Sequence, residues 1–285
     1  MKFEKLGNIA YIIAGQSPPS STYNNDGKGM PFFQGKADYG VKYPTVRYWC
    51  SEPTKISLPE DILISMRAPV GPVNINVIES CIGRGLSAIR VKKNVSRDYI
   101  YFWLKLNQHI ISAKETGSTF KAITQKVLNE IVVPFPSYDD QLHIANLLSK
   151  AENLITQRKQ SIALLDEFLK STFLEMFGDP VRNEKEWEKD KVISYTDCIV
   201  PGRDKPKSFT GDTPWFTTED LIHKGYVTKS KKGLGLSNEE IKEVRAREIP
   251  AGSVLITCVG DLGIISVCKE DCVVNQQLHA FICKE

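Results

Sequence analysis

Two kinds of hydrophobic spacing divide the chain, and they predict different elements. Short apolar runs between Gly, Pro, Asn and Asp predict strands at Asp61 to Met66, Ser87 to Val91 and Ser253 to Cys258. Helical spacing predicts a helix over residues 98–115 and a shorter one over Gln125 to Asn129. The pattern therefore predicts an α+β fold, in which small curved β-sheets carry short helices.

A different pattern follows Pro134 and Pro136. From Asp139 to Phe177 there is no Pro or Gly, and apolar residues recur every three or four positions. One helix of about 36 residues is predicted, about 54 Å long at 1.5 Å per residue. Its apolar stripe is expected to need a helical partner, as in a coiled coil, although Arg158 interrupts it and a packed interdomain helix without coiling is the alternative. The residues expected to contact the partner helix are Ile144, Leu148, Ala151, Leu154, Ile155, Ile162, Leu165 and Leu169.

An internal repeat organises the rest of the chain. Ile62 to Ser65 recurs 192 residues later as Val254 to Thr257, with Gly71 matching Gly263 and Ile82 to Ile89 matching Val274 to Phe281. Upstream, Pro31 to Phe33 faces Pro214 to Phe216. We therefore predict two related domains, at residues 1–136 and 181–285, separated by the long helix within residues 137–180.

Charge and composition narrow the setting. Residues 1–135 carry 17 Lys and Arg against 10 Asp and Glu, while the whole chain is only +3. Such a basic excess attracts polyanions, although a solvated basic surface without a partner is also common. Without a signal peptide or an apolar run of membrane-span length, we expect the protein to be cytoplasmic and not membrane-bound. Seven cysteines with no CxxC pair are expected to be reduced, mostly as small buried side chains.

A search for catalytic motifs finds none. The chain has no phosphate loop, no HExxH, no GxSxG and no Asn/Asp-Pro-Pro-aromatic run of the kind that holds a base in amino-group methyltransferases. Cys268 and Cys272, with His279 following, have the wrong spacing for a zinc knuckle. We therefore expect a non-catalytic protein that binds no metal or cofactor.

What the two copies do share is polar and basic residues on matching turns. Gln, Asn and Arg make paired hydrogen bonds to base edges, while Lys, Ser and Thr suit phosphates, so these turns are expected to face DNA; simple drift of loop sequence is the alternative. The candidate DNA-binding residues of the first copy are Gln16, Ser17, Gln34, Lys36, Arg67, Arg84 and Lys121. Those of the second copy are Arg203, Lys205, Thr217, Thr218, Asn275 and Gln276.

With these features in view, the chain resembles the specificity subunit of type I restriction-modification systems. The likeness covers nearly all 285 residues and rests on Gly15 to Pro19, Pro31 to Gln34, Gly117 to Ile123 and the entry to the long helix from Pro134 to Ile144. Of these motifs, the Pro-Phe-Pro helix entry is the most specific.

The resemblance implies two target recognition domains that each read one half of a split site in double-stranded DNA. It also implies that the conserved helices form an antiparallel coiled coil, and that methylation and cleavage belong to separate modification and restriction subunits. S-adenosylmethionine, ATP and Mg²⁺ are then expected on those partners. The runner-up is an oligomerisation scaffold with protein-binding β-rich domains; a cysteine or metal hydrolase comes third.

The chain departs from the family at its C-terminal end. Glu285 corresponds to a position near Lys93 of the first copy. About 40 residues of the second domain and the whole second helix are thus expected to be missing, through an expressed fragment, a split gene or an early stop. A helix without its partner inside the chain is expected to pair with a second copy, so a homodimer is predicted.

Overall fold

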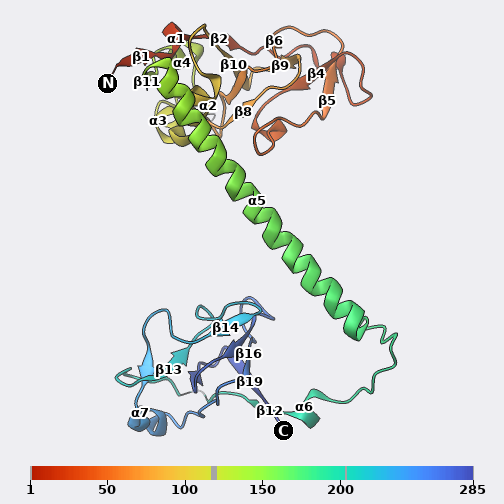
Figure 1. Cartoon of the computed structure of the whole chain (residues 1–285), viewed down its shortest axis with the longest axis vertical. Helices are drawn as coiled ribbons and strands as arrows, with labels where there is room; N and C mark the ends of the chain where they lie inside the picture. Colours follow the sequence, from red (N-terminus) through yellow and green to blue (C-terminus); the bar gives the residue numbers. More distant parts are fainter. Residues whose placement is uncertain (1, 117–120, 203, 285) are drawn as a thin grey trace. The chain divides into compact units, whose positions relative to one another are not determined.

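The computed structural model describes residues 2–116, 121–202 and 204–284. It divides into two compact units, Met1–Phe173 and Leu174–Glu285, and Figure 1 labels most of their elements. Both units combine sheets with short helices, so the predicted α+β class is confirmed. The division between the units falls inside the long helix, and the boundaries 1–136, 137–180 and 181–285 stay a prediction. Within the described residues, no helix is long and apolar enough to cross a membrane.

Unit 1 contains three sheets. The first is antiparallel and has the order β2 (Ala10–Ala14), β10 (Leu86–Val91), β7 (Ile62–Ser65), β8 (Val73–Ile75). The second has the order β3 (Tyr23–Asn24), β5 (Tyr48–Cys50), β4 (Met30–Phe33), β9 (Ser80–Ile82), β6 (Ile56–Ser57), with β4 and β9 parallel. A two-stranded sheet joins β1 (Phe3–Lys5) to β11 (Val132–Pro134).

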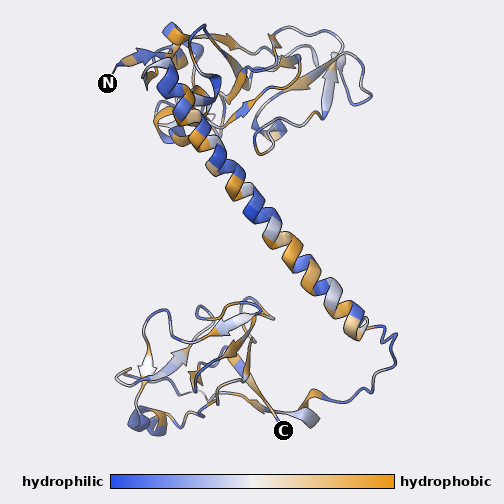
Figure 2. Ribbon diagram, in the orientation of Figure 1, coloured by the Kyte–Doolittle hydropathy of each residue, from blue (hydrophilic) through white to orange (hydrophobic). Residues whose placement is uncertain are grey.

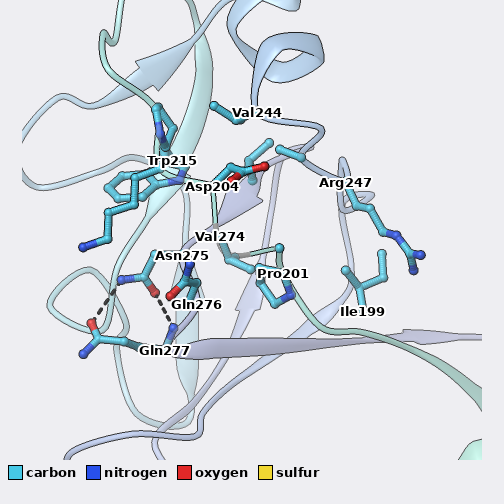
Figure 3. Close-up of a pocket in the computed structure, with 15 residues that line it drawn as sticks. Ile199, Pro201, Asp204, Trp215, Val244, Arg247, Val274, Asn275, Gln276 and Gln277 are labelled. Atoms are coloured by element: carbon cyan, nitrogen blue, oxygen red, sulfur yellow. Dashed lines mark hydrogen bonds between the residues drawn. The ribbon is translucent and has the colours of Figure 1, made fainter.

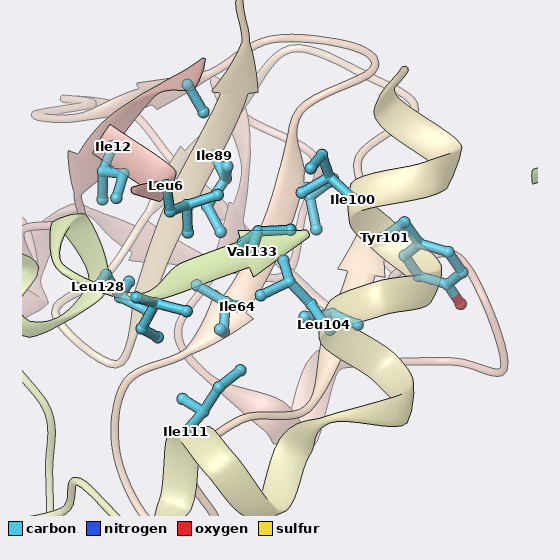
Figure 4. Close-up of a cluster of buried hydrophobic side chains, with 14 of the residues drawn as sticks. Leu6, Ile12, Ile64, Ile89, Ile100, Tyr101, Leu104, Ile111, Leu128 and Val133 are labelled. Carbon is cyan, nitrogen blue, oxygen red and sulfur yellow. The ribbon is translucent and has the colours of Figure 1, made fainter. Parts of the chain in front are cut away.

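The core of unit 1 lies between the first sheet and its helices (Figure 4). These helices are α1 (Leu6–Ile9), α2 (Arg97–Leu106), α3 (Gln108–Ser112) and α4 (Gln125–Asn129). Both the strands and the helices contribute apolar side chains to this core, because the period-2 spacing of a strand and the three- and four-residue spacing of a helix each bring apolar residues to one face. Its fully buried members are Leu6, Ile62, Ile64, Ile89, Ile100, Tyr101, Leu104, Ile111, Leu128 and Val133.

The helix predicted over residues 98–115 is wrong as one element. The structure has two helices, α2 and α3, which are separated at Asn107. Asn107 has φ −110° and ψ 29°, outside the helical region, and its Nδ2 donates a hydrogen bond to the Trp103 carbonyl at 2.8 Å. This local bond competes with helix continuation, a common effect of Asn. The apolar spacing survives the break because Ile111 still reaches the core.

The long helix α5 (Tyr138–Phe177) is present and has 40 residues, about 60 Å at 1.5 Å per residue. Ser137 begins it by accepting a hydrogen bond from the Asp140 amide at 3.2 Å, and Gly178 ends it with φ +75°. Its first turns are anchored on unit 1. The buried Gln141 accepts from the Ser96 amide at 2.9 Å and donates to the Pro136 carbonyl at 3.1 Å, and Glu152 forms an ion pair with Lys105.

Unit 2 repeats this plan with fewer elements. Its larger sheet has the order β12 (Thr196–Ile199), β19 (Leu278–Cys283), β16 (Val254–Thr257), β17 (Ile265–Cys268), β14 (Gly225–Val227). A smaller sheet has the order β15 (Gly235–Leu236), β13 (Thr213–Phe216), β18 (Val273–Val274). Two short helices accompany them, α6 (Val192–Tyr195) and α7 (Asn238–Glu243).

The strand registers of the two units coincide, which confirms two related domains. In unit 1 Ala88 pairs with both Leu63 and Ile13, and 192 residues later Ala280 pairs with both Leu255 and Ile199. The parallel pairs agree as well, with Phe32 opposite Cys81 in unit 1 and Trp215 opposite Val273 in unit 2. A slip of one residue in strand pairing would move every side chain to the other face of the sheet. Two units with the same strand pairing at one constant offset therefore share the same sheet arrangement.

Glu240 at the start of α7 gives unit 2 a pH dependence. Hydrogen bonds from the Ser208 hydroxyl, the Ser237 amide and the Thr210 amide hold the pKa of Glu240 at about 2, below its ordinary 4.5. A lowered pKa stabilises the fold above pH 4.5, and this contribution is lost as the pH falls toward 2. We expect Glu240→Gln to lower the urea midpoint of unit 2 at neutral pH and to flatten its fall between pH 4.5 and pH 2. The exposed neighbour variant Glu239→Gln is the control, and equal pH profiles for the two variants would contradict the assignment.

Candidate nucleic-acid interface

One turn has the same backbone bonding in both units. In unit 1 the Gly83 amide donates to the Phe33 carbonyl at 2.8 Å, and the Met66 amide donates to the Gly85 carbonyl at 2.8 Å. In unit 2 the Asn275 amide donates to the Phe216 carbonyl at 2.9 Å, and the Cys258 amide to the Gln277 carbonyl at 2.9 Å. Each turn is thus fixed to two strands, and its side chains are free to differ between the units.

Four predicted residues of unit 1 gather around this turn. The Gln16 amide donates to the Ile82 carbonyl at 3.0 Å, and the Arg84 amide donates to the Ser17 hydroxyl at 3.2 Å. A Cβ at Gly85 would lie 2.3 Å from the Gln34 carbonyl oxygen, so only glycine lets Gln34 approach the turn. Gln16, Ser17, Gln34 and Arg84 are all exposed. The structure therefore brings them together on one surface.

Lys36, Arg67 and Lys121 lie on the adjoining segments and are exposed as well. Lys36 opens a 3-10 turn, Lys36–Asp38, that follows Gln34, and the buried Asp38 accepts from the Gln34 amide at 2.7 Å. Arg67 follows Met66 and forms a β-bridge with Ala122, while the Ala68 amide donates to the Lys121 carbonyl at 3.1 Å. Lys121 also forms an ion pair with Glu115 at 3.6 Å. Arg67 and Lys121 thus lie on two backbone segments that are paired with each other.

In unit 2 the predicted residues are less uniform. Thr217 donates its amide at 2.7 Å and its hydroxyl at 2.9 Å to the buried Asp220, so this hydroxyl is engaged inside the unit. Asn275 donates to the Gln277 side chain at 3.0 Å and accepts from the Gln277 amide at 3.1 Å. Gln276 and Lys205 are exposed, and Thr218 is half-exposed. Arg203 lies outside the described residues.

Residues that the sequence analysis missed line a cavity of about 360 Å³ beside the turn of unit 2 (Figure 3). They are Trp215, Arg247 and Gln277, which lie there with Lys205 and Gln276. Gln277 was within reach of sequence reasoning because the repeat aligns it with Gly85. Arg247 was within reach in the same way, because the offset of 192 residues aligns it with Lys55, another basic residue, in a segment whose strand pairing is shared by both units.

The residues predicted for a partner helix divide into two groups. Leu148 is half-buried and packs against the unit 1 core, so its own unit covers it. The others face solvent along α5, where Figure 2 shows apolar residues recurring between polar ones. Their exposed fractions are 37% for Ile144, 60% for Leu154, 56% for Ile155, 60% for Ile162, 60% for Leu165 and 66% for Leu169, and Ala151 is exposed too.

The sequence predicts mostly buried cysteines and no metal site, and the described residues bear on both predictions. Cys50, Cys81, Cys268 and Cys272 are buried, as expected, whereas Cys283 is exposed. A hydrogen bond with Cys272 lowers the pKa of the Cys268 thiol below its ordinary value. No group of three or more His, Cys, Asp or Glu in residues 2–116, 121–202 and 204–284 could hold a metal ion.

Residues 1–165 match the family model described as the type I restriction modification DNA specificity domain. The chain belongs to this family. Among the relatives of this specificity-domain chain is the putative type I restriction enzyme MjaX specificity subunit of Methanocaldococcus jannaschii. It is 44% identical over 159 residues, which are 55% of this chain and 37% of the relative. The MjaIX specificity subunit of the same organism is 26% identical over 195 residues, which cover 64% of this chain and 45% of the relative. The chain thus spans less than half the length of these relatives.

Solved structures agree with this membership. The HsdS subunit from Thermoanaerobacter tengcongensis is 41% identical with a TM-score of 0.51, over 56% of this chain and 39% of that one. The S subunit of a type I system from M. genitalium gives a TM-score of 0.61, over 100% of this chain and 72% of that one, at 16% identity. The second likeness shows the shared fold alone. Because it covers both units and α5, it supports the fold of the whole specificity-domain chain.

Proposed function

We propose that this chain is the sequence-reading subunit of a type I restriction-modification complex, in which each unit reads one half of a bipartite DNA site. The observation that carries the proposal is the shared turn. Both units hold it with the same backbone bonds, yet unit 1 presents Gly83, Arg84 and Gly85 where unit 2 presents Asn275, Gln276 and Gln277. A constant frame with different base-reading side chains suits two different half-sites.

The charges of unit 1 support a DNA partner. The net charge of +7 over residues 1–135 adds a long-range attraction for phosphates to the local surface around Arg84. Among the described residues, the side chains of Gln16, Gln34, Lys36, Arg67 and Arg84 make no hydrogen bond or ion pair within the protein. Their polar groups remain available for an external ligand. In this proposal Arg and Gln read bases, whereas Lys contacts the backbone.

The helix has a separate role in this proposal. α5 sets the distance between the two readers and offers its apolar stripe to modification subunits or to a second long helix. In this proposal the restriction subunit associates with the assembled complex and is not a direct partner of α5. S-adenosylmethionine, ATP and Mg²⁺ then belong to those partners, and this chain contributes recognition without catalysis.

Selection from a pool of random duplexes, followed by a salt titration, tests the function. We expect one enriched sequence whose affinity falls by about a thousand-fold between 50 and 200 mM salt, because phosphate contacts release counterions. The isolated chain should transfer no methyl group from labelled S-adenosylmethionine to that duplex. An oligomerisation scaffold would enrich no sequence, and this outcome would overturn the proposal.

A further inference from the structure

The cavity in unit 2 has a mixed lining that the role of the turn does not explain. Its lining includes the buried Val273 and Val274 and the half-buried Trp215. In Figure 3 the side chains of Asn275, Gln276 and Gln277 gather on one side of Pro201, and Arg247 extends on the other. Lys205 and Asp204 add one cation and one anion to the lining. An apolar and aromatic interior thus meets amide and charged groups at its edge.

The repeat shows that the segment beside this cavity is held differently in the two units. In unit 1 the segment after β2 lies on the turn, since a Cβ at Gly15 would be only 2.2 Å from the Gly83 carbonyl oxygen. The Thr54 hydroxyl holds that segment by donating to the Gln16 carbonyl at 2.6 Å. At the offset of 192 residues the place of Thr54 is taken by Ala246, which has no hydroxyl. Among the described residues, no hydrogen bond joins residues 200–202 or 204–206 to the turn of unit 2.

We infer that this cavity binds one nucleotide whose base carries an exocyclic amino group. The base would stack on Trp215, a contact that any base can make. The amides of Gln276 and Gln277 and the carboxylate of Asp204 would meet its polar edge, and an acceptor carboxylate favours an amino-bearing base. Lys205 and Arg247 would attract its phosphate. The volume of about 360 Å³ lies within the range of small-molecule sites.

Two sources can supply this ligand, a free nucleotide or a nucleotide displaced from the stack of bound DNA. The second source rests on the proposed function, and the first does not. The chemistry is the same in both cases. The experiment therefore begins with a mononucleotide and then adds DNA as a competitor.

The probe is the 5′-monophosphate of 2-aminopurine deoxyriboside, titrated with the full chain. Its fluorescence should be quenched on stacking against Trp215, with dAMP and dCMP displacing it better than dTMP. Trp215→Ala should weaken the quench by about ten-fold or more. Because Trp215 also packs on Phe209 with ring centres 5.0 Å apart, Gln277→Ala provides a second variant that leaves Trp215 in place. Gln160→Ala, on the exposed surface of α5, is the matched control and should bind the probe like the parent chain.

The competition step separates the outcomes. Displacement of the probe by the selected duplex assigns the site to a nucleotide of DNA, and retention beside bound duplex assigns it to a free nucleotide. A chain that binds no duplex but still quenches the probe keeps the cavity site and loses the proposed function. Absence of quenching at millimolar probe overturns the inference, as does quenching that neither Trp215→Ala nor Gln277→Ala reduces.

Discussion

Alanine at Gln16, Gln34, Lys36, Arg67 and Arg84 together should abolish sequence-specific DNA binding by unit 1. All five side chains are exposed beside one turn, and a base-reading contact is worth about 1 to 3 kcal/mol, so even two such contacts amount to at least about 2 kcal/mol. Single substitutions should have different effects for base-reading residues and for residues that contact phosphates. Arg84→Ala should relax the sequence preference at one position, whereas Lys36→Ala should weaken all duplexes alike and reduce the salt slope by about one.

Competition between the selected duplex and single-base variants of it measures both effects. The matched control is Lys93→Ala, an exposed cation beyond the far end of β10, a strand that is itself about 20 Å long at 3.3 Å per residue. It changes the net charge as much as Lys36→Ala does but lies away from the proposed surface. If the five-residue variant still binds the selected duplex as tightly as the parent chain, the DNA-facing surface of unit 1 lies elsewhere.

The sequence predicted this surface because the repeat aligned the two copies. The alignment at 192 residues placed Arg84 opposite Gln276, and the same offset relates the strand registers in the structure. Glycines added a second signal. Gly15 and Gly85 allow close backbone approach in unit 1, where a Cβ would meet a carbonyl oxygen within 2.3 Å. Close backbone contacts of this kind require glycine, so the glycines in the sequence helped to locate these turns.

Neither the cavity of unit 2 nor the break at Asn107 could be recognised from glycines or from hydrophobic periodicity in the sequence. The feature that sets this segment of unit 2 apart is one side chain, Ala246 in place of Thr54, and the segment that Thr54 holds in unit 1 corresponds to residues more than forty positions away from Ala246 in the sequence. At Asn107 the helix breaks where the Asn107 side chain donates one hydrogen bond to the Trp103 carbonyl, within an otherwise helical pattern. Hydrophobic periodicity records which face is buried, and it is insensitive to individual polar bonds. Thr217 follows the same rule, because its bond to Asp220 decides whether its hydroxyl is available.

The isolated chain should associate through α5, and charged residues on the stripe should prevent it. Leu154, Ile155, Ile162, Leu165 and Leu169 are each more than half exposed, and among the described residues no other helix exceeds ten residues. A contiguous apolar surface of this length is unfavourable in water and marks an interaction site. An antiparallel pair of α5 helices would bury both stripes and place two copies of unit 1 about a two-fold axis. Such a dimer would read an inverted repeat instead of an asymmetric site.

Light scattering across a dilution series, on the chain without partner subunits, measures this association. Burying one leucine is worth about 1.5 to 3 kcal/mol, and Leu154→Glu with Leu165→Glu removes four leucines from each dimer, so the dissociation constant should rise by about 1,000-fold or more. Asn153→Glu with Gln160→Glu adds the same charge on the opposite helix face, at 3.6 residues per turn, and should leave the dimer intact. A chain that stays monomeric at every concentration, with or without the leucine substitutions, would mean that the stripe does not pair with a second copy.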